Sequence, residues 1–116
     1  MQEPKDMEFI QDETDGFRVS CVPSESSRNP NGTVHGGVIF LLCEEAIARY
    51  LVHKGRKGAA AEADIHYYRP AQIGERMTAA VTERKIGRRL GSYLLEVKND
   101  CGQLLADTVI TIAYLD

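Results

Sequence analysis

The chain has 116 residues, of which 43% are apolar, and its 14 basic and 17 acidic side chains give a net charge of −3. This length predicts one domain, residues 1–116, because a second hydrophobic core needs a longer chain. The balance of charges gives no global reason to bind nucleic acid or an anionic membrane surface. No apolar run reaches the roughly 20 residues of a membrane span, and the acidic N-terminus lacks the order of a signal peptide. We therefore expect a cytoplasmic protein.

Three cysteines, Cys21, Cys43 and Cys101, are far apart and odd in number. No Cys/His pair has metal-ligand spacing, so we expect no metal site, and a structural disulfide is not expected in a reducing compartment. A chain this small buries only about two thirds of the surface of its unfolded form. Association would bury more, so we expect a homo-oligomer.

The first third of the chain passes from an arm to a strand and then a loop. Residues 1–13 indicate a short helix or a loose arm, which leads into the domain at about residue 16. Residues 17–22 alternate apolar and polar side chains, which predicts a strand that Pro23 ends. Residues 24–32 are rich in Ser, Asn, Pro and Gly and predict a loop.

A long helix and a run of strands make up the rest. From Gly36 or Gly37 to about Val52 the apolar residues occupy nearly every side of a helix, which is typical of a helix buried on most sides. Further strands are predicted at residues 59–68, 77–86, 91–99 and 104–114, with a tight hairpin turn at 100–103. Antiparallel strands after one apolar helix predict an α+β fold, a curved sheet wrapped around that helix.

Two adjacent acids, Glu44 and Glu45, lie in the predicted helix. Glu45 precedes Arg49 by four residues, the spacing of a solvated helical ion pair worth about 0.2–0.5 kcal/mol. Glu44 instead has apolar residues one turn away on both sides and no cation at helical spacing. Burying an unpaired carboxylate costs several kcal/mol. Glu44 therefore either reaches solvent at an edge or faces a cleft where its charge is used.

The helix begins at the glycine-rich turn His35-Gly36-Gly37, and glycine lets another group approach the backbone closely. The first amides of a helix are free donors at the positive end of its dipole, and they suit a developing oxyanion. The alternative is that the glycines only turn the chain and pack tightly. His35 has no Ser or Cys nucleophile at a suitable spacing, and Cys43 lies on a buried-looking face.

Two further sets of charged residues have both a structural and a functional interpretation. On the strand at 59–68, one face carries Glu62, Asp64 and His66, and the opposite face carries Ala61, Ala63, Ile65 and Tyr67. The polar face is either solvent-exposed or directed toward the helix. Residues 84–89 form a dense basic run at a turn between two strands. The run is either an exposed hairpin or a clamp for phosphates, which arginine suits by its forked geometry.

One spaced pattern resembles a known family: Asn29, Gly32, His35-Gly36-Gly37, Phe40 and Glu44. The chain resembles the hotdog-fold thioesterase superfamily, in particular the PaaI-type (phenylacetate-pathway) acyl-CoA thioesterases, in which an acid follows the His-Gly-Gly histidine by nine residues. Residues 64–70, which end in Arg-Pro, and residues 102–106 resemble later parts of that family. The likeness covers residues 17–116. It implies a hotdog fold, in which the curved sheet wraps the central helix.

The resemblance also implies roles for single residues. Gly36 matches the backbone N–H that polarises the thioester carbonyl, with Gly37 beside it in the substrate site. Asn29 matches the side chain that holds the nucleophilic water or the carboxylate, and His35 matches the histidine that shapes the entry to the helix. Glu44 matches the general base or nucleophile.

Further positions concern substrate binding and the departures from the family. Arg88 and Arg89 would lie near the nucleotide end of coenzyme A. Many relatives have Asp where this chain has Glu44, and the longer arm leaves open whether the carboxylate attacks the acyl carbon or activates water. Relatives often carry a hydroxyl at the positions of Ala48 or Glu62. Both hydroxyls are missing here, so either Glu62 substitutes for them or the activity is weak.

The resemblance thus predicts an acyl-CoA thioesterase that releases a small or aromatic acid from coenzyme A, without a cofactor beyond the coenzyme A of the substrate. The implied assembly is a homodimer or a homotetramer with active sites at the subunit interface. Two alternatives stay open: a hotdog protein that binds acyl-CoA without catalysis, and a hotdog enoyl-CoA hydratase or dehydratase.

Overall fold

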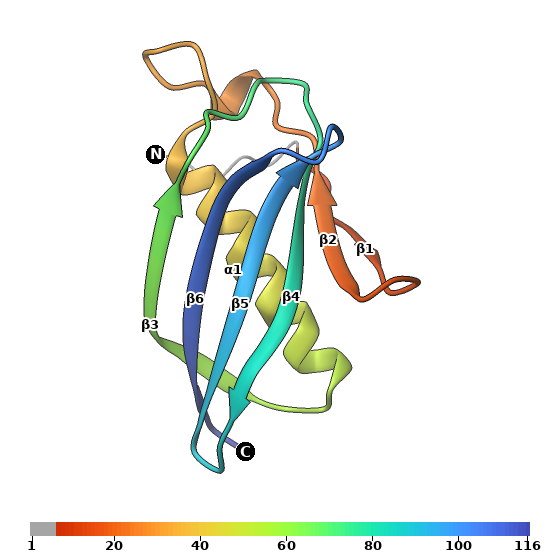
Figure 1. Ribbon diagram of the computed structural model, residues 1–116, viewed down its shortest axis with the longest axis vertical. Helices are drawn as coiled ribbons and strands as arrows, with labels where there is room; N and C mark the ends of the chain where they lie inside the picture. The colour runs from red at the N-terminus through yellow and green to blue at the C-terminus, as the bar shows by residue number, and fades with distance from the viewer. Residues whose placement is uncertain (1–6) are drawn as a thin grey trace.

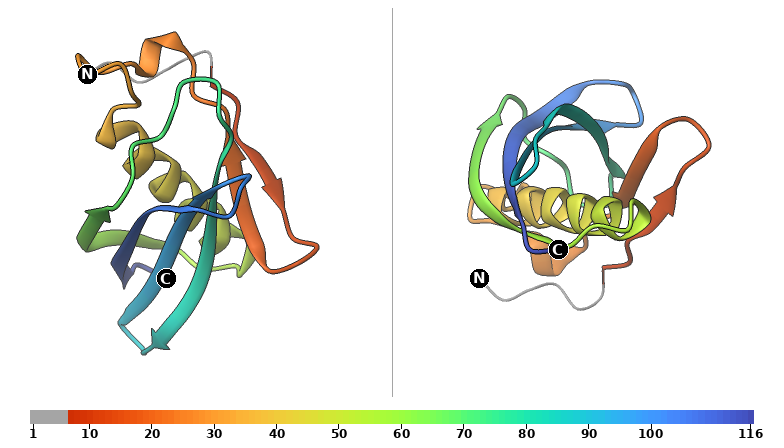
Figure 2. Two further views of the ribbon diagram at one scale, coloured as in Figure 1. Left: turned by 45° about the horizontal axis from the view of Figure 1, so that its top comes forward. Right: turned by 90° about the horizontal axis from the view of Figure 1, so that it is seen from below.

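A computed structural model of the chain describes residues 7–116, and in it one curved sheet wraps around one long helix (Figure 1). The six strands pair antiparallel in the order β1-β2-β4-β5-β6-β3. Their bounds are Ile10–Asp12 (β1), Phe17–Cys21 (β2), Gly58–Tyr67 (β3), Met77–Ile86 (β4), Leu90–Asn99 (β5) and Leu104–Tyr114 (β6). Seen from below, the strands arch over the helix (Figure 2). The predicted α+β arrangement is confirmed.

Helix α1, Gly36–His53, provides one side of the core. The other side comes from alternate residues of the strands, and burying a large apolar side chain contributes about 1.5–3 kcal/mol. Among the fully buried side chains are Val19, Val38, Leu42, Met77, Leu95 and Ile110. The helix is not buried all round, because Gly37, Glu44, Ala48 and Val52 form an exposed stripe along it.

The end of α1 is fixed by Gly55, close to the predicted helix end at about Val52. Gly55 has a φ of +69°, a left-handed conformation that glycine adopts without steric cost. Its N–H donates to the Val52 carbonyl at 3.0 Å, and the N–H of Arg56 donates to the Leu51 carbonyl at 2.8 Å. These two bonds form a Schellman motif, which satisfies carbonyls that the helix leaves open and turns the chain toward β3.

The N-terminal prediction needs correction. Residues 1–6 lie outside the described part of the chain, and residues 10–12 are a short strand, β1, rather than a helix or a loose arm. β1 exists because its backbone pairs with β2, and the turn between them is held by Asp12, whose carboxylate accepts the N–H of Thr14 at 2.9 Å. The predicted loop also contains a short 3₁₀ helix, Glu25–Ser27.

Strand β3 lies at the edge of the sheet, and it pairs only with β6 within residues 7–116. Its pairing shifts by one residue between Ala60 and Glu62, so that Ala61 forms a β-bulge. Simple alternation assumed an unbroken ladder and did not predict the bulge, which leaves Ala61 without a partner on β6. Beyond the bulge the predicted alternation holds.

No helix within the described residues is long and apolar enough to cross a membrane.

Candidate active site

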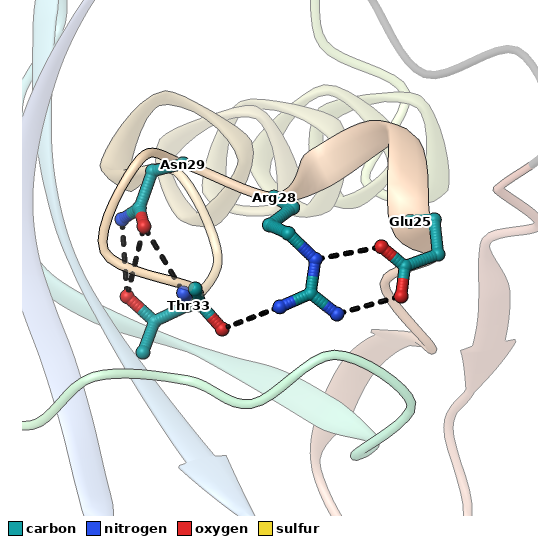
Figure 3. Close-up of polar contacts among 5 residues, drawn as sticks. Glu25, Arg28, Asn29 and Thr33 are labelled. Carbon is teal, nitrogen blue, oxygen red and sulfur yellow. Dashed lines mark hydrogen bonds and ion pairs between the residues drawn. The ribbon is translucent and has the colours of Figure 1, made fainter.

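The loop that leads into α1 is held by the side chain of Arg28 (Figure 3). Its guanidinium donates to both carboxylate oxygens of Glu25 at 2.6 Å, and it also donates to the carbonyl of Gly32 at 3.0 Å. The bonds from Arg28 keep the pKa of Glu25 below its usual value, so the pair stays charged at neutral pH. Gly32 has a φ of +83°, so the loop turns at a residue that accepts a left-handed backbone.

Asn29 lies inside the same loop, and its side chain binds the loop itself (Figure 3). The amide oxygen accepts the backbone N–H of Asn31 at 2.9 Å and that of Thr33 at 3.0 Å. The amide nitrogen donates to the Thr33 hydroxyl at 3.0 Å and lies 3.4 Å from the Val34 carbonyl. The local contacts of Asn29 therefore position the segment that precedes the helix.

The His35-Gly36-Gly37 turn follows directly. The N–H of His35 donates to the Ser27 carbonyl at 2.8 Å, and the carbonyl of His35 receives the N–H of Val38 at 3.0 Å. The imidazole of His35 makes no capping hydrogen bond. Within residues 7–116, the N–H groups of Gly36 and Gly37 have no acceptor. Two adjacent free donors thus mark the positive end of the α1 dipole.

Gly36 borders a cavity of about 380 Å³ at the N-terminal end of α1. Its wall includes both Asn29 and Gly36, which the sequence placed in one site. The other lining residues come from the loop, the first turns of α1 and the segment that ends β3: Thr33, Val34, Ile39, Tyr67, Tyr68, Arg69 and Pro70.

One contact in this cavity joins segments that are distant in the sequence. The hydroxyl of Tyr67, the last residue of β3, donates to the carbonyl of Gly36 at 2.8 Å. The sequence analysis did not predict this contact, because it left open which face of the strand at 59–68 is directed toward the helix. Nothing local connects two residues that lie 31 positions apart.

Glu44 is exposed on the open stripe of α1, and its carboxylate has no hydrogen-bond or ion-pair partner within residues 7–116. Glu45 pairs with Arg49 at 3.1 Å, as its spacing predicted. Eight residues separate Gly36 from Glu44, so the two lie about 12 Å apart along the helix axis. They cannot act on one carbonyl group from the same chain.

Cys43 is fully buried beside Glu44, and burial raises the pKa of its thiol to about 12, with a smaller contribution from the charge of Glu44. A thiol with this pKa is protonated at neutral pH and is a poor nucleophile. The location of Cys43 agrees with its exclusion from the predicted chemistry. No group of three His, Cys, Asp or Glu side chains suited to a metal ion occurs in the part of the chain that is described.

The remaining predicted residues lie away from the cavity within one chain. Glu62 pairs with Thr111 on the outer face of the sheet, away from α1. On the same face, His66 lies 3.7 Å from both Asp64 and Asp107. Arg88 and Arg89 form the tip of the β4–β5 hairpin, at the opposite end of the molecule from Gly36 (Figure 1).

Comparison with known proteins identifies relatives. The sequence pattern of the thioesterase superfamily matches residues 31–106. A putative esterase of Deinococcus radiodurans is 36% identical over 101 residues, 86% of this chain and 68% of the relative. The acyl-coenzyme A thioesterase PaaI of Escherichia coli is 31% identical over 86 residues, 73% of this chain and 61% of the relative. The chain therefore spans about two thirds of the length of these relatives.

Solved structures agree on the fold. The protein smu.793 of Streptococcus mutans, solved with bound acetyl-CoA, superimposes with a TM-score of 0.85 over 98% of this chain and 92% of that chain, at 20% identity. The arrangement of α1 and the sheet is the hotdog fold that the sequence predicted. From the match over residues 31–106, which contains the His35-Gly36-Gly37 turn and Glu44, it follows that this chain belongs to the thioesterase superfamily, a family of thioester hydrolases.

Proposed function

We propose that this protein hydrolyses acyl-CoA thioesters of small or aromatic acids, with the thioester oxygen bound at the N-terminus of α1. The observation that carries the proposal is the pair of free N–H groups at Gly36, which borders the cavity, and at Gly37, the residue that follows it. When the acyl carbon becomes tetrahedral, negative charge develops on its oxygen. Fixed amide donors stabilise that charge without having to reorganise.

Glu44 is the proposed base or nucleophile for attack on the acyl carbon. Its carboxylate is exposed and has no partner within residues 7–116, so it is available to take a proton from water or to attack directly. In the first route the carboxylate gains the proton of water, the hydroxide adds to the acyl carbon, and the proton passes to the sulfur of coenzyme A as the C–S bond breaks. In the second route the Glu44 carboxylate displaces the coenzyme A thiolate to form an anhydride. Water then hydrolyses the anhydride, which regenerates the carboxylate and releases the acid, and one proton of the water passes to the thiolate.

The distance along α1 means that Gly36 of one subunit must work with Glu44 of another. The edge strand β3 supports such an assembly, because most of its residues are exposed and an exposed strand edge readily pairs with a second chain. We propose a homodimer, or a dimer of dimers, formed through this edge. Antiparallel pairing would bring the Gly58 end of one β3 level with the Tyr67 end of its partner.

The same pairing gives the basic hairpin a role. Gly58 pairs with Tyr114, and the N–H of Tyr114 donates to the Arg89 carbonyl at 2.9 Å, so Arg88 and Arg89 lie level with the Gly58 end of β3. In the proposed dimer they lie level with the partner's cavity, about three strand spacings or 15 Å to the side. Forked guanidinium groups at that reach suit the phosphates of coenzyme A.

Glu44→Gln tests the proposal, with Glu45→Gln as the matched control. We expect Glu44→Gln to lose roughly 10²–10⁴-fold in turnover on a panel of acyl-CoAs, measured by thiol release, because it removes the base. Glu45→Gln loses only a partly buried ion pair with Arg49 and should retain activity. Undiminished hydrolysis by Glu44→Gln would contradict the proposed role of Glu44. Saturable acyl-CoA binding by the wild type without thiol release would favour the binding protein instead, and addition of water to enoyl-CoA would favour the hydratase.

A further inference from the structure

Tyr67 contacts the peptide group that follows Gly36 in two ways. Its hydroxyl donates to the Gly36 carbonyl at 2.8 Å, and its ring covers the α-carbon of Gly36 so closely that an added methyl group would lie 2.9 Å from a ring carbon. At that distance the ring would have to move, and as the end of a half-exposed side chain it can do so. A methyl group at Gly36 would therefore displace the Tyr67 ring from this contact, independently of any substrate.

The bonded carbonyl belongs to the same peptide group as the N–H of Gly37. In an α-helix this carbonyl also accepts the N–H four residues ahead, so the Tyr67 hydroxyl is a second donor to it. A donor on the oxygen polarises the whole peptide group, which makes its N–H a stronger donor in turn. It also fixes the plane of the peptide, and with it the direction of the Gly37 N–H.

We propose that Tyr67 is a positioning residue for the oxyanion-binding turn: it holds the Gly36–Gly37 peptide in the orientation that presents the Gly37 N–H beside that of Gly36. This inference rests on the proposed thioester hydrolysis. The hydroxyl acts through the backbone and does not touch the reacting carbonyl. Partial burial raises the pKa of Tyr67 above its usual value, so the phenol keeps the proton that it donates.

The neighbouring Tyr68 is a natural control. Both tyrosines are about half exposed, at 49% for Tyr67 and 56% for Tyr68. The Tyr68 hydroxyl also makes one hydrogen bond, to Asp107 at 2.9 Å. That bond lies on the outer face of the sheet beside His66, away from the Gly36 carbonyl. Removing either hydroxyl deletes one atom and one bond, but only one of the two bonds concerns the turn.

The kinetic experiment compares Tyr67→Phe with Tyr93→Phe on an acyl-CoA that the wild type hydrolyses. The Tyr93 hydroxyl bonds to that of Tyr114 and lies outside the cavity, so Tyr93→Phe is the control for kinetics. We expect Tyr67→Phe to lower kcat about three- to tenfold with little change in KM, because the lost bond matters most when charge develops on the thioester oxygen. Tyr93→Phe should keep both constants. A kcat for Tyr67→Phe equal to that of Tyr93→Phe would overturn the inference.

A second measurement does not depend on activity. The ¹⁵N chemical shift of an amide responds to hydrogen bonds on the carbonyl of its own peptide group, so Tyr67→Phe should move the Gly37 resonance while Tyr68→Phe leaves it in place. An unmoved Gly37 resonance would refute the contact. If the wild type hydrolyses no acyl-CoA but the resonance moves, the proposed function fails and the contact between Tyr67 and the turn stands.

Discussion

The two ends of helix α1 differ in how their polar groups are used. At the C-terminal end, the Tyr50 hydroxyl donates to Glu83 at 2.5 Å, and the hydroxyls of Tyr93 and Tyr114 bond to each other. The ring of Tyr114 also lies under the guanidinium of Arg56 at 3.8 Å. At the N-terminal end, two amides remain free beside a cavity. At the C-terminal end the polar groups bond to one another and stabilise the fold. At the N-terminal end they are left available to a ligand.

The difference has an energetic basis. Hydroxyls buried in an aromatic cluster cost free energy unless each finds a partner, and at the C-terminal end they find one another. That end needs nothing from outside the chain. The N-terminal loop is just as firmly held, by Arg28 and Asn29, but its bonds are directed backward into the loop. The turn is therefore rigid while its outward donors stay open, which is the arrangement that preorganised binding needs.

The largest effect on stability is expected at the C-terminal end of α1. A methyl group at Gly91 would collide with the Tyr114 hydroxyl, so Gly91→Ala should lower the free energy of unfolding by about 1–3 kcal/mol in urea titrations. Gly36→Ala also meets a tyrosine, but Tyr67 is half exposed and can swing outward, so its cost in stability should be smaller. Equal losses in the free energy of unfolding for Gly91→Ala and Gly36→Ala would contradict the contrast between the two ends of α1.

A double variant tests whether the collision with the Tyr114 hydroxyl causes the loss of stability in Gly91→Ala. Tyr114→Phe removes the oxygen that the new methyl group would meet. The cost of Gly91→Ala should therefore be smaller in the Tyr114→Phe background than in the wild type, because the two positions are coupled. Additive costs would show that the collision is not the reason for the loss.

An intermediate effect on stability is expected at the N-terminal end of α1. Asn29→Ala removes the acceptor of two backbone N–H groups, and we expect it to cost about 1–2 kcal/mol in the free energy of unfolding. It should also lower kcat, since the turn would lose its support. Asn31→Ala is the control, because it keeps the backbone N–H that Asn29 accepts and should stay within about 0.5 kcal/mol of the wild type. Similar stability for the two variants would argue against a structural role for Asn29.

The smallest effect concerns the pH dependence of stability, at the C-terminal end of α1. Asp116 accepts hydrogen bonds from Arg56 and from the N–H of Lys57, which lower the pKa of its carboxyl to about 2 from an ordinary value of 3.8. A depressed folded-state pKa adds stability above the unfolded-state value, and that contribution is lost as pH falls through about 2. Thermal midpoints between pH 5 and 2 should therefore fall less steeply in Asp116→Asn than in the wild type. Parallel curves would show that the pair contributes nothing.

The sequence predicted the regular elements well where the hydrophobic pattern is strong. The bounds of β4 and β6 were predicted to the residue, because apolar and polar positions alternate there in part or throughout. β1 was missed because all three of its residues are exposed, so that only its pairing with β2 makes it a strand. The bulge at Ala61 was missed for a related reason, since register depends on the neighbouring strand.

The site was predictable in its local part. Asn29 and Gly36 lie seven residues apart, and their approach follows from one loop and one helix start. The contact between Tyr67 and Gly36 depends on how β3 lies against α1, which no local pattern encodes. The roles of Glu44, Glu62, Arg88 and Arg89 involve a second chain in the proposed assembly. Their relation to the cavity was therefore beyond what the pattern of one chain could supply.

The bulge in β3 also sets the phase of everything that follows it. Beyond Ala61, Tyr67 faces Ala106 on the inner side of the sheet, and His66 faces outward. If Ala61 were paired in an unbroken ladder from Gly58, the register would shift by one, and His66 would occupy the place opposite Ala106. The bulge, near the far end of the strand from the cavity, thus decides which aromatic side chain reaches the start of the helix. A change in residues 58–62 that removed the bulge while keeping the length of the strand would then change the chemistry at Gly36 without altering any residue near it.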